Sequence, residues 1–358
     1  MSFGKLLSLM APRTSRALVS GECLSKMARI AAQFPLTAVG YFGFETRLQS
    51  EDAHSDFAFS LSRDGVEGLA ENSSQWAPIS SFCRLWNETA PEAEQDGTIW
   101  LEFDVDGSAT QVPSLFFALL EPEATLLSAG ECERSLSWLC GEALPALWQR
   151  AIPRSIEGHL ARCVEALPAT ADRIQIGTML ARKVDALRFC GFQVMAEAVL
   201  PFLGRIEWPG DLEAVAGILE RYAGLAHSFC VHVDIAQAVL PTLGLELLFP
   251  PGDPWDWQPL YDSRWQRLFD TLVADGYCLP AKRDALLEWP SRVIHQTPLV
   301  EKLIDAAGLH MPGDAPSLPD GVLVMGLQHV KLSLMPGREP TAKAYFGARY
   351  DRGIGISP

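Results

Sequence analysis

The chain has 358 residues, of which 48% are hydrophobic and 20% are charged, a composition that predicts a large buried core rather than disorder. Its 44 acidic residues outnumber its 29 basic residues and give a formal net charge of −15. This excess argues against a general nucleic-acid or anionic-membrane binder, because both kinds of partner need a basic protein surface.

The first predicted unit pairs a helical stretch with a β-hairpin. Leucine, methionine, alanine and isoleucine recur at helical spacing in residues 5–34, which predicts one or two amphipathic helices. Residues 41–48 and 55–61 then alternate polar and apolar side chains, as in a hairpin with one dry and one wet face. We expect Glu45 and Arg47 to lie on the wet face.

A second unit follows in the same order. Residues 64–90 have helical character, and the runs 99–105 and 114–120 predict the next hairpin, with an Asp-Gly turn signal between them. Three side chains share one face of its first strand: Trp100, Glu102 and Asp104. Two carboxyl groups at adjacent positions on one face raise each other's pKa, which favours a general base or a metal-binding site.

The third unit repeats this pattern. Residues 131–166 predict two helices with a break near Pro153, and residues 173–192 predict a hairpin on which Arg188 and Cys190 share a face. Helical patterns then resume in two stretches, residues 195–206 and 211–224.

The fourth predicted hairpin, within residues 227–249, places His232 and Asp234 beside Glu246. An HxD pair with a distant histidine, here His329, also resembles the ligand set of non-haem iron oxygenases. The helical stretches between them argue against the fold of those enzymes. We therefore interpret His232 and Asp234 as a catalytic acid–base pair or as a structural pair.

The last unit ends in residues 327–349, two alternating runs around a Pro-Gly turn. Helices are predicted before it, at residues 265–276 and 281–289, followed by a loop rich in proline and glycine at residues 308–320. Four side chains share the wet face of the hairpin: His329, Lys331, Lys343 and Tyr345. Such a wall of cations and hydrogen-bond donors favours an anionic ligand, although a solvated sheet face has the same pattern.

The repetition of helices followed by a hairpin, five times, predicts one closed architecture. Ten antiparallel strands that close on themselves leave no open sheet edge, with the polar face inward and the apolar face under a ring of helices. We expect an α+β fold in which a single domain spans residues 1–358 and encloses a lumen with room for a ligand.

This order of elements resembles the ABBA or PT-barrel prenyltransferases, whose barrel consists of five α-α-β-β units around a lumen. The resemblance implies transfer of a prenyl group from an allylic diphosphate to an aromatic small molecule or a peptide side chain. It implies that lumen cations hold the diphosphate and that tyrosines shield the allyl cation. Five side chains suit those roles by position: Arg47, Arg188, Lys331, Lys343 and Tyr345.

The resemblance also implies a role for Glu45, which matches the position of a carboxylate that orients the acceptor in indole-modifying relatives. Trp100, together with Phe116 and Tyr345, would supply an aromatic wall that stabilises a carbocation by cation–π contact. Here the sequence departs from the family, since the second hairpin offers Glu102 and Asp104 where relatives often have a lysine.

The expected lumen therefore holds more carboxylates than cations, and several interpretations stay open. Mg²⁺ could bridge carboxylates and phosphates, or acids and bases could lie at opposite ends of the lumen. The barrel could instead perform acid–base or hydrolytic chemistry on a peptide or other polar substrate, with Glu102, His232, Asp234 and His329 as its working groups. A third hypothesis is a non-catalytic barrel that binds a polar ligand or peptide.

The remaining motifs bear on location and on function classes. Eight cysteines include no CxxC pair and no zinc-ligand spacing, so we expect buried thiols in a reducing cytoplasm. We expect no signal peptide, and no apolar run approaches the ~18 residues of a membrane span. The sequence has no Walker loop, GxSxG elbow or HExxH motif, which argues against the common nucleotide-binding, hydrolase and zinc-protease sites.

Overall fold

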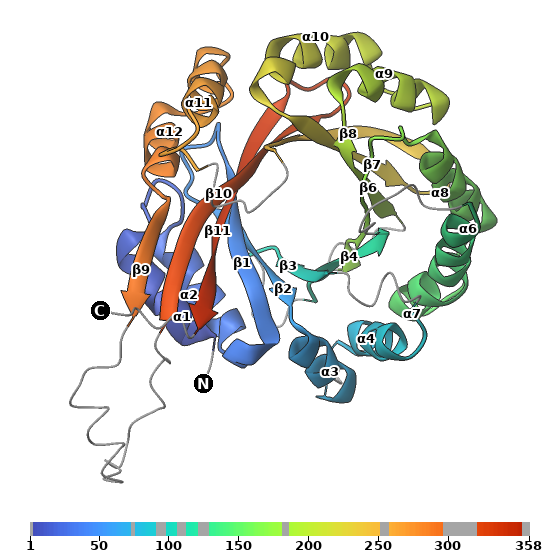
Figure 1. The fold of residues 1–358 in the computed structure, drawn as a ribbon, viewed down its shortest axis with the longest axis horizontal. Helices are drawn as coiled ribbons and strands as arrows, with labels where there is room; N and C mark the ends of the chain where they lie inside the picture. The colour runs from blue at the N-terminus through green and yellow to red at the C-terminus, as the bar shows by residue number, and fades with distance from the viewer. Residues whose placement is uncertain are drawn as a thin grey trace.

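The strands form a closed antiparallel barrel with helices around it (Figure 1). A computed structural model describes residues 3–72, 76–90, 98–105, 112–120, 129–180, 186–250, 258–295 and 321–352. The barrel strands are β1 (Val39–Arg47), β2 (Ser55–Leu61), β3 (Ile99–Phe103), β4 (Ser114–Leu120), β5 (Ile174–Thr178), β6 (Leu187–Val194), β7 (Ser228–Ile235), β8 (Val239–Leu248), β10 (Gly321–Leu334) and β11 (Thr341–Arg352).

Each barrel strand pairs with its neighbours in the chain, and the last hairpin closes the ring. β11 pairs with β1 from Tyr41 opposite Arg349 to Arg47 opposite Lys343, and β10 pairs with β8 on its other edge. The predicted α+β barrel of ten antiparallel strands is confirmed. That one domain spans residues 1–358 stays a prediction.

The helices lie outside the barrel, in pairs before each hairpin except the third, where three helices stand in place of the predicted two (Figure 1). They are α1 (Gly4–Met10), α2 (Gly21–Ala31), α3 (Arg63–Asn72), α4 (Ala77–Thr89), α6 (Ala129–Trp138), α7 (Leu144–Trp148), α8 (Arg154–Ala166), α9 (Ala196–Arg205), α10 (Leu212–Tyr222), α11 (Arg264–Ala274) and α12 (Pro280–Leu287). Local sequence fixes their starts: Ser20 accepts a hydrogen bond from the Cys23 amide, and Asp211 accepts two amide hydrogen bonds at the start of α10. No described helix is both long and apolar enough to cross a membrane.

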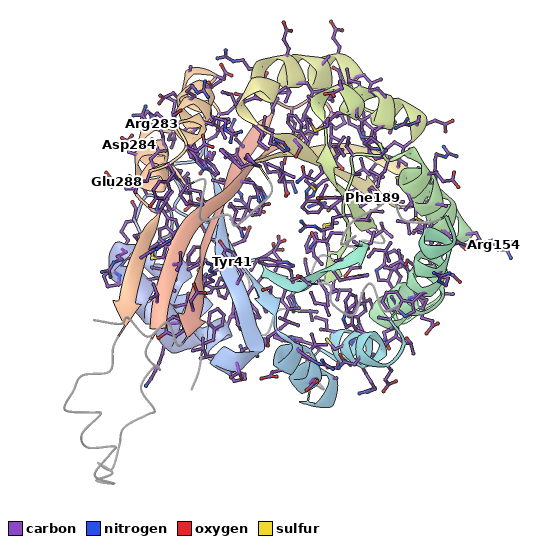
Figure 2. The ribbon with its side chains drawn as sticks, in the orientation of Figure 1. Tyr41, Arg154, Phe189, Arg283, Asp284 and Glu288 are labelled. Atoms are coloured by element: carbon purple, nitrogen blue, oxygen red, sulfur yellow. The ribbon has the colours of Figure 1, made fainter. Side chains whose placement is uncertain are left out.

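The hydrophobic core fills the layer between the outer face of the barrel and the helices. Period-two alternation turns Phe42, Phe57 and Phe59 outward, where Phe3 beside α1 packs against all three with ring centroids 4.9 to 5.9 Å apart. Polar side chains at the alternate positions therefore face inward. Figure 2 shows the same division, with Tyr41 toward the interior and Arg154 on the outside of the helix ring.

An eleventh strand, β9 (Ser291–His295), was not predicted. It pairs with the first five residues of β10, a strand that begins at Gly321, six residues before the predicted hairpin. β8 and β9 share one edge of β10 and leave the backbone of Leu327 between them. The Gln258 side chain fills this gap, because its amide accepts from Leu327 N at 2.7 Å and donates to Leu327 O at 2.9 Å.

Candidate functional site

A cavity of about 400 Å³ lies inside the barrel, within the size range of small-molecule sites. Asp172 and Arg173, just before β5, line the cavity together with charged and histidine side chains from seven barrel strands: Glu45, Asp56, Glu102, Arg188, His232, Glu246, His329 and Lys331. Aromatic side chains alternate with them: Tyr41, Trp100, Phe116, Phe192, Phe249 and Tyr345. The cavity therefore combines an apolar lining with many titratable groups.

One side of the cavity is an acidic wall formed by Glu45, Asp56 and Glu102 on β1, β2 and β3. Lys343 and the Tyr345 hydroxyl from β11 both donate to the Glu45 carboxylate. Burial by itself would raise the pKa of Glu45, but Lys343 and Tyr345 outweigh burial and lower it to about 2. Glu45 is therefore an anion at neutral pH.

The pKa of Glu102 is raised rather than lowered, although this residue lies on the same acidic wall as Glu45. Burial raises its pKa, the Glu45 carboxylate raises it further, and the lowering by Lys343, Arg188 and Lys331 leaves it at about 7. Asp56 also has a raised pKa, from burial and from Glu45, although it accepts a hydrogen bond from the Val105 amide. A carboxyl group with a pKa near 7 exchanges protons readily at physiological pH.

The cation on β6 is held by a neighbouring acid. Arg188 lies opposite Asp234 in the β6–β7 register, and its Nε and Nη2 donate to the two carboxylate oxygens at 2.8 and 3.1 Å. Thr242 also donates to Asp234 at 3.0 Å. Burial would raise the pKa of Asp234, but Arg188 lowers it below its usual range.

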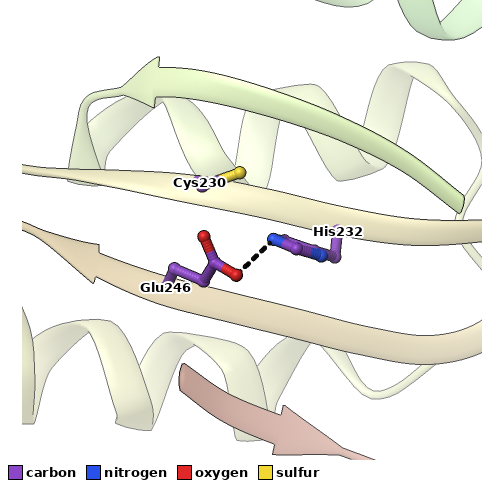
Figure 3. Close-up of side chains that lie close together, drawn as sticks. All are labelled: Cys230, His232 and Glu246. Carbon is purple, nitrogen blue, oxygen red and sulfur yellow. Dashed lines mark ion pairs between the residues drawn. The ribbon is translucent and has the colours of Figure 1, made fainter. Parts of the chain in front are cut away.

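The side of the cavity opposite the acidic wall is a histidine wall, defined by His232, Glu246, His329 and Lys331. His232 Nε2 lies 2.9 Å from Glu246 Oε1 (Figure 3), and His329 Nε2 lies 3.4 Å from the same oxygen. Lys331 Nζ lies 2.9 Å from His232 Nδ1 and 3.7 Å from Glu246 Oε1. Burial opposes ionisation of Glu246, but the two histidines hold its pKa well below the usual range.

Two buried thiols lie behind the histidine wall. Cys190 Sγ is 3.4 Å from His232 Nδ1, and Cys230 lies directly opposite Glu246 in the β7–β8 register. Burial would raise the pKa of Cys190, but Cys230, His232 and Lys331 lower it to about 5. Gly244 leaves room for this cluster, since a Cβ atom there would lie 2.6 Å from Lys331 Cε.

The aromatic lining depends on a second glycine. Gly177 on β5 lies opposite Phe116 on β4, and a Cβ atom at Gly177 would lie 2.2 Å from the Phe116 ring. We expect Gly177→Ala to lower the free energy of unfolding by about 1–3 kcal/mol through overpacking, measured by urea denaturation. Gly217→Ala in α10 is the matched control, because nothing lies within 4 Å of its added methyl group and we expect a gain of up to about 1 kcal/mol. Equal stability of the two variants would contradict this packing.

Most of the site residues predicted from the sequence line the cavity. These are Glu45, Trp100, Glu102, Arg188, His232, Glu246, His329, Lys331 and Tyr345. Lys343 reaches the site indirectly, through its hydrogen bond to Glu45.

Three predicted residues lie elsewhere. Arg47 is the last residue of β1 and is exposed, so its side chain is outside the cavity lining although it shares the inward parity of Glu45. Asp104 follows the end of β3 and also lies outside the lining. Asp234 pairs with Arg188, and it is not part of the one group of three potential metal ligands among the described residues, so the facial triad that the HxD motif resembles is not formed there.

Several lining residues were not predicted. Asp172 and Arg173 precede β5, and Gln328 reaches the lining because a register shift between Leu327 and His329 interrupts the alternation of β10. A bulge has no sequence signal here. Cys230, which lies behind the lining, was also missed but was detectable, since it lies two residues before His232 on the same face of a predicted strand.

Comparisons with known proteins support the fold. No known protein family matches the sequence, and no curated protein matches it. Among solved structures, the crystal structure of the prenyltransferase PriB in its apo form aligns with a TM-score of 0.52, covering 98% of this chain and 99% of that chain. The sequence identity is 15%. The chain therefore has the PT-barrel fold, and a likeness at this identity concerns the fold alone.

Proposed function

We propose that this PT-barrel protein is an enzyme that transfers a prenyl group from an allylic diphosphate to an electron-rich acceptor inside the lumen. The acceptor is an aromatic small molecule or an aromatic side chain of a peptide. Two features of the chain support this proposal, a base on the acidic wall beside Trp100 and cations that line the same cavity. The likeness in fold to PriB, which is a prenyltransferase, agrees with it.

The observation that carries the proposal is Glu102. Its pKa of about 7 lets it accept a proton at neutral pH, and it lies two residues from Trp100 on the inward face of β3. In the proposed reaction the carbon–oxygen bond of the donor breaks, and its electron pair leaves on the diphosphate. The acceptor forms the new bond to the allyl carbon and loses its proton to Glu102.

Positively charged side chains in the cavity lining would stabilise the leaving diphosphate. Arg173, Arg188 and Lys331 line the cavity, and Trp100, Phe116 and Tyr345 in the same lining would stabilise an allyl cation by cation–π contact. Mg²⁺ could assist diphosphate binding by bridging lumen carboxylates and the phosphate groups, since both are ligands that it prefers.

The test is release of pyrophosphate. Purified protein is incubated with dimethylallyl diphosphate and a panel of indoles, phenols and aromatic peptides. We expect it to release one pyrophosphate for each molecule of prenylated acceptor that forms. Reactions without acceptor and reactions with heat-denatured protein serve as controls. No pyrophosphate above these controls, across the panel and with Mg²⁺ added, would contradict prenyl transfer.

A second function is favoured by one specific observation, the pairing of lumen cations with protein carboxylates. Lys343 pairs with Glu45, Arg188 pairs with Asp234, and Lys331 lies 3.7 Å from Glu246. Cations that are neutralised in this way bind a diphosphate less strongly. Acid–base or hydrolytic chemistry on a peptide or other polar substrate, with Glu102 and His232 as working groups, needs no such donor. Turnover of polar peptides without diphosphate would favour this second function over the first.

A further inference from the structure

We infer that the histidine wall holds a zinc-type metal ion, with Cys230, His232 and Glu246 as its protein ligands. One ligand atom of each side chain lies within 4.8 Å of the other two, and all three side chains are buried (Figure 3). Among the residues that the structure describes, this is the only such group of three or more potential ligands. Two come from β7 and one from the facing position of β8, so the strand register fixes their spacing.

The spacing of the nitrogen and oxygen atoms of His232 and Glu246 fits a shared metal ion, and the Cys230 sulfur lies within 4.8 Å of both. Zinc–nitrogen and zinc–oxygen bonds of about 2.0–2.1 Å in a tetrahedron place neighbouring ligand atoms roughly 3.3 Å apart. His232 Nε2 and His329 Nε2 lie 2.9 and 3.4 Å from Glu246 Oε1. His329 Nε2 faces the same oxygen but falls outside the group of three ligand atoms, so the fourth position on the lumen side is left for water or a substrate.

An independent observation also points to a ligand here. The Nε2 atoms of His232 and His329 are buried and make no well-aligned hydrogen bond among the described residues, and both face the same oxygen of Glu246 as an ion pair. His232 is 7% exposed. A buried polar atom without a well-aligned hydrogen bond is costly, and coordination of a cation by His232 Nε2 would remove that cost.

The donor atoms select the metal. A thiolate, an imidazole and a carboxylate suit zinc, whereas Mg²⁺ prefers oxygen ligands with octahedral geometry. Binding releases the thiol proton of Cys230 to solvent, and the two anionic ligands balance the charge of the metal. This zinc site is distinct from the Mg²⁺ expected for diphosphate binding.

The surrounding residues supply an outer shell. Coordination through Nε2 leaves the His232 proton on Nδ1, where Cys190 Sγ lies 3.4 Å away as an acceptor. Lys331 Nζ, which lies 2.9 Å from Nδ1, would then turn toward the Glu246 carboxylate 3.7 Å away. Catalytic zinc sites, unlike purely structural ones, have three protein ligands and a fourth position that is open to the cavity, as here. Zinc binding here does not depend on prenyl transfer.

The test is metal content and cobalt spectroscopy of the full-length, tag-free protein. We expect about one zinc per chain after reconstitution, and a thiolate-to-cobalt charge-transfer band with tetrahedral ligand-field bands after exchange into Co²⁺. Cys230→Ser should remove the charge-transfer band. Glu246→Gln should weaken zinc binding by more than the roughly 10- to 100-fold that loss of an outer-shell partner costs. Cys163→Ser, a buried thiol in α8, is the matched control and should keep both signals.

Two further measurements separate a metal site from a structural cluster. Zinc should raise the melting temperature of the unaltered protein, and this rise should disappear in Glu246→Gln. Lys331→Met should still bind zinc, because Lys331 is not a ligand. Absence of stoichiometric zinc and of a cobalt–thiolate band in the unaltered protein would overturn the inference, as would full zinc occupancy in both Cys230→Ser and Glu246→Gln.

Discussion

Glu102→Gln is expected to lower the rate of product formation by about 100-fold or more, because general base catalysis typically contributes 10²–10⁴-fold. Glutamine preserves the size of the side chain and its place beside Trp100, but it cannot accept the proton that the acceptor loses. The rate under saturating substrate is the measurement. Glu157→Gln, an exposed residue on α8, is the control and should leave the rate unchanged.

Glu102 also predicts the direction in which the reaction rate changes with pH. The proton-accepting form of Glu102 is the carboxylate, and burial and Glu45 raise its pKa to about 7. The rate should therefore rise as pH increases through 7 and level off above it. Lys343, Arg188 and Lys331 oppose the shift, so replacing any of them should move the midpoint upward. A rate in Glu102→Gln that keeps the original midpoint and amplitude would contradict the assignment.

Lys343→Met is expected to have the largest effect on stability, a loss of about 3 kcal/mol in the free energy of unfolding at pH 7. The substitution leaves the buried Glu45 carboxylate without its ammonium partner, although Tyr345 still donates to it. Chemical denaturation measures the loss. Combining Lys343→Met with Glu45→Gln should recover part of it, since the second change removes the unpaired charge. Lys26→Met, which breaks an exposed pair with Glu22 on α2, should change the free energy little.

The stability supplied by Glu45 also has a defined pH window. Lys343 and Tyr345 lower its pKa in the folded state to about 2, below the ordinary glutamate value of about 4.3. A lowered pKa stabilises the fold above the ordinary value, and this contribution is lost as pH falls from about 4 toward 2. The difference between the unaltered protein and Lys343→Met should therefore shrink over that interval. A difference that stays constant down to pH 2 would contradict the pairing.

The sequence predicted the architecture because each hairpin carries its own period-two signal. Glu45, Glu102 and His232 were placed inward from their neighbours alone, since Phe44, Leu101 and Val233 beside them had to face the core. Five such local signals, each preceded by helices, leave few closed arrangements besides a ten-stranded barrel.

The positions of the strand ends and the pairing of charged side chains could not be predicted from alternation within single strands. Arg47 has inward parity, but only the position where β1 ends decides whether its side chain reaches the cavity. The pairing of Arg188 with Asp234 depends on the register between β6 and β7, which alternation within one strand does not determine. β9 is short and pairs with a part of β10 that precedes the alternating run, so neither length nor pattern predicted it.

The central claim is that the lumen holds Glu102 as a group that changes protonation state near neutral pH. A carbon-13 NMR titration of labelled glutamate side chains measures this directly and requires no knowledge of the substrate. We expect one carboxyl resonance with a midpoint near pH 7 that disappears in Glu102→Gln. A titration in which every glutamate resonance has its midpoint below about pH 5, near the ordinary value, would contradict the claim.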